Sequence, residues 1–120
     1  MRKAKVFVSD KEAGVLYESE LGKSYRFSYL ANYAGLPVSL TMPTSQRIYE
    51  FNTFPPFFDG LLPEGYQLEG LLKTGKIDRN DMFSQLLAVG DDLVGNVTIK
   101  EAFDHDSNDG IRPFNGEDQS

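Results

Sequence analysis

The side chains that most often perform catalysis are nearly absent from this sequence. It contains no cysteine, and its single histidine, His105, lies in an acidic stretch where nothing is expected to orient it as a base. Nucleophile–base pairs and zinc sites built from cysteine and histidine therefore cannot be assembled. No glycine-rich phosphate loop and no kinase signature element occurs either. We predict that the protein is not an enzyme and carries no cofactor.

Two groups of carboxylates remain as candidates for metal binding. The first, Gly90-Asp91-Asp92, fits a helix-ending glycine followed by a turn of solvated acids better than a divalent-metal site, because a strand is expected next. The second, within residues 104–109, resembles a calcium loop only loosely, since its glycine is misplaced and no glutamate stands at the twelfth position. We predict no metal site.

A third group, at the end of the aromatic and proline-rich segment 54–66, has the character of a binding surface. Glu64, Gly65 and Tyr66 follow Pro63 at a corner where side chains tend to project, and they are our candidate partner-binding residues. An ordinary helix start, with Tyr66 packed inward, is the alternative. The apolar residues just before this corner predict a hydrophobic plug between sheet and helix: Phe57, Phe58, Leu61 and Leu62.

The elements that would position this corner indicate an α+β fold, a small antiparallel β-sheet or partly closed barrel packed against two helices. The helices are expected from Pro63 to about Gly75 and from Asp78 or Asn80 to Gly90. Gly95 predicts a bulge or a close backbone approach in the last strand. Alternating or β-branched stretches predict strands at 3–8, 15–20, 24–30, 38–41, 49–51 and 93–99.

Length and charge predict one domain, residues 1–103, followed by a disordered acidic tail, residues 104–120. The net charge is −6, and the last twenty residues hold six acids against one base, Arg112. Without a cluster of Lys and Arg beyond residue 5, direct nucleic-acid binding is not expected. The apolar run at the N-terminus ends at Val8, too short for a signal peptide or a membrane helix, so we expect a cytoplasmic protein without membrane contact.

Four motifs together give the sequence a family resemblance. They are LPVSLTMP at 36–43, FFDGLLPEG at 57–65, Asn80-Asp81 with Phe83 and Leu86-Leu87, and GDDLVGNV at 90–97. In this order and spacing, over roughly residues 3–100, the chain resembles the N-terminal domain of HipA-type toxin kinases.

The resemblance implies a function as well as a fold. In split HipBST systems a small separate protein, HipS, looks like this domain and neutralises the kinase HipT. The chain is thus expected to be an antitoxin that binds a HipT- or HipA-like serine/threonine kinase, with a DNA-binding HipB-like protein joining through the complex. The alternative is a structural or regulatory N-terminal domain of a full-length HipA-like kinase, without inhibitory activity.

The chain departs from the family pattern at two positions. Asn96 stands where the family commonly has alanine, and Tyr66 stands where an aromatic residue, often tryptophan, follows Pro-Glu-Gly. A tyrosine keeps a flat amphipathic ring that suits an interface.

Overall fold

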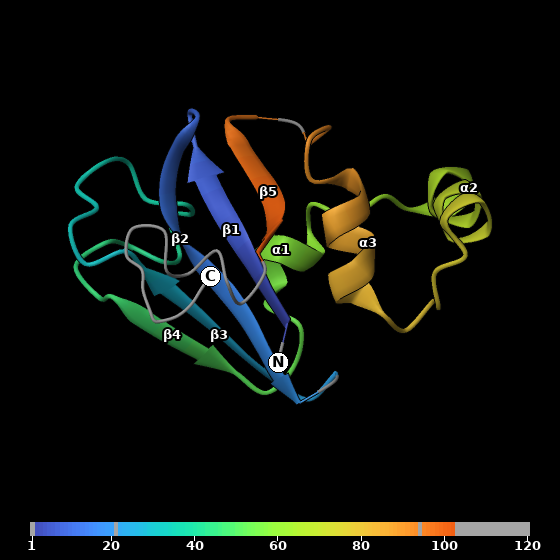
Figure 1. Ribbon diagram of the computed structural model, residues 1–120, viewed down its shortest axis with the longest axis horizontal. Coiled ribbons are helices and arrows are strands. Elements are labelled where there is room, and N and C mark those ends of the chain that lie inside the picture. The colour runs from blue at the N-terminus through green and yellow to red at the C-terminus, as the bar shows by residue number, and fades with distance from the viewer. Residues whose placement is uncertain (1, 21, 94, 103–120) are drawn as a thin grey trace, which may run out of the picture.

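The computed structural model describes residues 2–20, 22–93 and 95–102, which form an α+β fold built on one antiparallel sheet (Figure 1). The strand order is β4-β3-β2-β1-β5, and the sheet is open, with β4 and β5 as its outer strands rather than closed into a barrel. The strands are β1 (Arg2–Val8), β2 (Lys11–Glu20), β3 (Ser24–Tyr29), β4 (Ile48–Phe51) and β5 (Val97–Ala102). The helices are α1 (Pro56–Asp59), α2 (Gly65–Gly75) and α3 (Met82–Val89).

The first three strands form because apolar and polar residues alternate along them. Tyr25, Phe27 and Tyr29 of β3 all point to the buried face, as the sequence predicts. The β1–β2 hairpin turns on only Ser9 and Asp10, whose φ angles are 50° and 68°. Such left-handed pairs match the twist of a two-residue hairpin. The second strand therefore begins at Lys11, four residues before the predicted start at residue 15.

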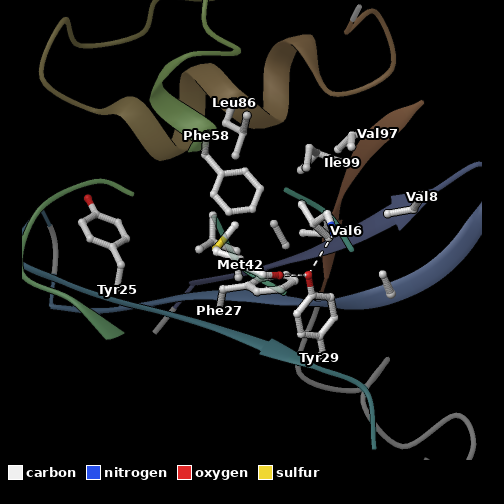
Figure 2. Packing of buried hydrophobic residues seen from close by; sticks show 14 of the residues in the cluster. Val6, Val8, Tyr25, Phe27, Tyr29, Met42, Phe58, Leu86, Val97 and Ile99 are labelled. Carbon is white, nitrogen blue, oxygen red and sulfur yellow. Dashed lines mark hydrogen bonds between the residues drawn. The ribbon is translucent and has the colours of Figure 1, made fainter. Parts of the chain in front are cut away.

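The core lies between one face of the sheet and two of the three helices (Figure 2). Phe58 from α1 and Leu86 from α3 reach down toward Phe27 and Val6 of the sheet, and all four side chains are fully buried. Burial of a large apolar side chain contributes about 1.5–3 kcal/mol. The predicted plug is therefore only partly confirmed: Phe58 is buried, and its apolar neighbours Phe57, Leu61 and Leu62 are half-buried.

Several predicted boundaries differ from the structure. The segment 38–41 is not a strand, because its only pairing is an isolated bridge between Ser39 and Met42. The last strand begins at Val97, and Gly95 lies before it with φ of 98°, which suits a loop and not a bulge inside the strand. Helix α3 is capped by Asp81, not by Asp78 or Asn80.

The end of α3 is set by a close approach to the sheet. Gly90 follows the helix as expected, and the backbone N–H of Ile99 in β5 donates to its carbonyl oxygen at 3.0 Å. A Cβ atom on Gly90 would lie 2.1 Å from the carbonyl oxygen of Ile99. Glycine is needed here for space, since its backbone is right-handed and any residue could adopt it.

Residues 30–47, between β3 and β4, form an irregular loop that is tied down by tyrosine hydroxyls. Tyr29 accepts a hydrogen bond from the backbone N–H of Val38 at 2.9 Å and donates one to the carbonyl of Met42 at 2.5 Å. Tyr33 donates to the carbonyl of Leu36 at 2.5 Å. The loop is therefore held in one conformation by buried aromatic side chains that themselves belong to the core.

The predicted acidic tail, residues 104–120, lies outside the described residues, as does His105.

Candidate partner-binding surface

The corner predicted to present a binding surface is a sharp turn into α2. Glu64 is extended, with φ of −132°, and Gly65 has φ of 60°, a left-handed conformation that favours glycine. The side chain of Glu64 makes no capping hydrogen bond to the helix, and it is exposed. The helix thus begins two residues after Pro63 and turns away from the chain that leads into it.

Tyr66 points into solvent, with 97% of its side chain exposed. At about 100° per residue, it falls on the side of α2 opposite to Leu68, Leu71 and Leu72, which are half-buried. The ring therefore cannot pack inward while these leucines face the body of the domain. The structure brings Glu64, Gly65 and Tyr66 together on one exposed corner, and the inward alternative for Tyr66 is wrong.

Helix α2 is held less firmly than α1 or α3. It contains no buried residue, and in Figure 1 it stands at one end of the molecule, beyond α3 and away from the sheet. Its inner side covers a groove of about 580 Å³ whose apolar walls include Leu61, Leu62, Leu71, Val89 and Leu93. Since α2 rests over a groove instead of filling it, the helix is only loosely packed against the rest of the domain.

Charged side chains of both signs lie on and beside α2. Glu64 and Glu69 are the acids nearest to Tyr66 in the sequence, and Lys73 and Lys76 follow in the last turn and at the end of the helix. Glu64 is exposed near Tyr66, and Glu69, one helical turn after Tyr66, pairs with Arg79 at 2.8 Å.

Away from this corner, a polar cluster that the sequence did not predict joins the sheet to α3. The guanidinium of Arg2 donates to Glu18 at 2.7 Å, to Asp81 at 2.8 Å and to Ser84 at 2.9 Å. Tyr25 donates to the other oxygen of Glu18, whose side chain is only 3% exposed. Burial, and then the hydrogen bond to Glu18, raises the pKa of Tyr25.

Because these groups satisfy one another, this cluster fits a structural tie and not a reactive site. The carboxyl of Asp81 accepts from the backbone N–H of Ser84 at 3.1 Å and so also caps α3. Burial acts to raise the pKa of Asp81, but the hydrogen bonds from Arg2 and Ser84 outweigh it and hold that pKa below its ordinary value.

Of the two carboxylate groups weighed as metal ligands, only Asp91 and Asp92 lie within the described residues, and the group within 104–109 lies outside them. Asp91 and Asp92 are exposed in a turn, where the N–H of Asp92 donates to the carbonyl of Val89. Within residues 2–20, 22–93 and 95–102, no group of three or more His, Cys, Asp or Glu side chains could hold a metal ion. In the same part of the chain, no helix has the length and apolar character needed to cross a membrane.

Comparison with known proteins points to one family. The family model described as the HipA N-terminal domain matches residues 4–100. An uncharacterised protein of Haemophilus influenzae (strain Rd) is 37% identical over 101 residues, which are 84% of this chain and 93% of that protein.

A solved structure agrees with the family match. The chain is similar to the solved N-terminal domain of HipA toxin, with a TM-score of 0.68 and 33% identity, over 87% of this chain and 95% of that one. That domain and the present one share sequence as well as fold, so the resemblance seen in the motifs is confirmed. The chain belongs to the HipA N-terminal domain family.

Proposed function

We propose that this protein is an antitoxin that binds a HipT- or HipA-like serine/threonine kinase and holds it inactive, acting by contact and not by catalysis. The observation that carries the proposal is Tyr66, an aromatic side chain 97% exposed on a helix without buried residues. A domain gains nothing in its own stability from such a ring, whereas tyrosine is among the residues that dominate binding energy at interfaces.

The chemistry of the corner suggests how the contact would be made. Tyr66 can enter a cleft of the kinase with its ring against apolar groups and its hydroxyl toward a polar one. The exposed carboxylate of Glu64, next to Tyr66, complements a basic group at the rim of a phosphate-binding cleft. Docking beside the nucleotide lobe would then either block the active site or favour an inactive arrangement of the kinase.

The relative from Haemophilus influenzae supports a role for such a domain as a separate protein. The match spans 93% of that relative, which therefore consists of little more than this domain. The likeness to the N-terminal domain of HipA toxin favours the alternative, a structural or regulatory domain of a larger toxin without inhibitory activity. In both cases the domain contacts a kinase body, and they differ in whether contact inhibits the kinase. We place the complex in the cytoplasm, with any HipB-like protein bound through the kinase.

Substitution of Tyr66 tests the proposal. The Tyr66→Ala variant should bind a purified HipT-like kinase at least about 30-fold more weakly, the equivalent of about 2 kcal/mol at an interface hot spot. Its free energy of unfolding should stay within about 0.5 kcal/mol of wild type, because the ring is exposed. Binding is measured by titration calorimetry without nucleotide or metal. Neutralisation is measured as the loss of kinase autophosphorylation when the protein is added.

Two further variants separate the contribution of the Tyr66 ring from that of its hydroxyl and from effects of surface substitution in general. Tyr66→Phe keeps the ring and should retain most of the affinity, whereas Lys23→Ala, at an exposed position in the β2–β3 turn, should bind like wild type. If wild type binds the kinase tightly without lowering its activity, the non-inhibitory alternative is correct. If Tyr66→Ala neutralises the kinase at the wild-type dose, Tyr66 is not the contact.

A further inference from the structure

The loop at the other end of the molecule exposes leucines in the manner of a contact surface. Among the described residues, the large hydrophobic side chains that are exposed, other than Tyr66, are Leu36 at 65%, Leu40 at 94% and Ile48 at 48%. All three lie in or directly beside the loop 30–47. In Figure 1 this loop, drawn in cyan, lies at the left of the long axis, and α2 lies at the right.

Leu40 is presented by a tight turn whose polar groups satisfy one another. The N–H of Met42 donates to the carbonyl of Ser39 at 3.0 Å, and the N–H of Thr41 donates to the Ser39 hydroxyl oxygen at 3.1 Å. The hydroxyls of Ser39 and Thr41 are hydrogen-bonded to each other at 2.8 Å. On both sides of the turn, Tyr29 fixes the backbone of Val38 and Met42. A leucine on so ordered a turn loses little conformational entropy when it is buried by a partner.

The charge pattern favours one kind of partner, a second copy of the chain. Residues 27–46 contain no charged side chain and form the longest such run in the sequence, whereas the whole protein carries a net charge of −6. Across a two-fold axis each surface meets its own copy, so a charged surface repels itself and an uncharged one does not. This loop is where two copies can approach with the least repulsion.

A hollow beside Leu36 gives this surface a complementary shape. It has a volume of about 230 Å³ and room for an aliphatic side chain. Its lining is Val8, Ser9, Lys11, Tyr33, Gly35 and Leu36. Lys11 is the charged residue of this lining and is exposed, so its ammonium group can remain in solvent when the hollow is filled. We propose that two copies associate through this end, with Leu40 of each copy entering the hollow beside Leu36 of the other.

Such a dimer would leave both α2 corners free. Because the loop and α2 lie at opposite ends of the long axis, the two α2 helices would lie at the far ends of the dimer (Figure 1). Each dimer could then hold two binding partners, and linked sites of this kind raise the effective affinity for paired targets. The dimer itself does not depend on the proposed kinase.

Sedimentation equilibrium of the purified chain tests the inference without a kinase. The small apolar surface predicts a weak dimer, with a dissociation constant of about 0.1–1 mM. Leu40→Glu should raise that constant at least about tenfold, because it places two like charges at the contact. The control, Gln67→Glu, adds the same charge to exposed α2 and should dimerise like wild type.

Salt supplies a second readout. Added sodium chloride screens the repulsion between two chains of charge −6 and should strengthen an uncharged contact. Three results would overturn the inference: a wild-type chain that stays monomeric at about 1 mM, a dimer that Leu40→Glu does not weaken, or a dimer that salt dissociates. A Leu40→Glu variant that loses kinase binding and shows unchanged self-association would assign the loop to the kinase instead.

Discussion

The irregular loop 30–47 is attached to the domain more firmly than helix α2, although only the helix has regular secondary structure. The loop has almost no regular pairing, yet Tyr33, Val38 and Met42 within it are buried, and three tyrosine hydroxyls bond its backbone. The helix has regular backbone hydrogen bonds and no buried residue. Attachment to a domain depends on buried side chains and satisfied polar groups, and these do not follow from secondary structure.

The difference also bears on how each end can bind. A loop in one fixed conformation binds without losing much entropy but cannot adapt, whereas a helix over a groove can shift to fit its partner. We therefore expect the Leu40 turn to act as a rigid contact and α2 as an adjustable one. Two experiments, at Tyr29 and inside α2, test this contrast, and a third tests the tie between the sheet and α3.

Among the three tested positions, Tyr29, Asp81 and Leu71, the largest loss of stability is expected at Tyr29. The Tyr29→Phe variant keeps the ring but leaves the N–H of Val38 and the carbonyl of Met42 without their partner. Each unsatisfied buried group costs about 1–3 kcal/mol, so the free energy of unfolding should fall by about 2–4 kcal/mol in urea titrations. Tyr66→Phe, which removes an exposed hydroxyl, serves as the control and should change stability by less than about 0.5 kcal/mol. Equal effects of the two variants would show that the loop is not anchored in this way.

A smaller loss of stability is expected at low pH, where protonation of Asp81 weakens its hydrogen bonds with Arg2. The pKa of Asp81 is lowered on folding, because hydrogen bonds from Arg2 and Ser84 outweigh the opposing effect of burial. The resulting stabilisation is complete above the unfolded pKa of about 3.9 and is lost as pH falls through the lower folded value. Between pH 7 and pH 2, Asp81→Asn should therefore lose less stability than wild type in urea titrations. Identical pH profiles for the two proteins would contradict it.

The smallest effect is expected inside α2. Leu71→Ala removes a half-buried side chain that lines the groove, and alanine favours a helix, so stability should fall by at most about 0.5 kcal/mol. Leu86→Ala, in the fully buried part of α3, should cost about 2–5 kcal/mol. Amide hydrogen exchange should likewise be faster in α2 than in β1. A loss at Leu71 as large as at Leu86 would show that α2 is packed as firmly as α3.

The sequence predicted the sheet better than it predicted the loop. Alternation of apolar and polar residues identified β1 and the inward face of β3, because a strand with one buried face must alternate. Nothing local distinguishes 38–41 from a short strand. Its conformation depends on Tyr29, about ten residues earlier, and a hydrogen bond of this kind leaves no periodic signal.

At the binding surface the exposed position of Tyr66 could have been predicted more firmly. Once Leu68, Leu71 and Leu72 are taken as the inner side of a helix, the helical period alone places Tyr66 on the outer side. Gly65 and Gly70, on either side of Tyr66 in the sequence, obscured that stripe. The tie between Arg2 and Asp81 could not have been foreseen, because it joins residues 79 positions apart in the sequence.

The way in which the edges of the outer strands β4 and β5 are covered should limit aggregation of the domain. An unpaired strand edge can template the addition of further strands from other molecules, as in amyloid. Here the carbonyl of Gly90 already accepts the N–H of Ile99 on β5, and the side-chain amide of Gln46 already donates to the carbonyl of Ile48 on β4. Replacing Gly90 with any larger residue would push α3 away from β5 and uncover that edge. Such a variant should form thioflavin-positive fibrils at concentrations where the wild-type domain stays clear.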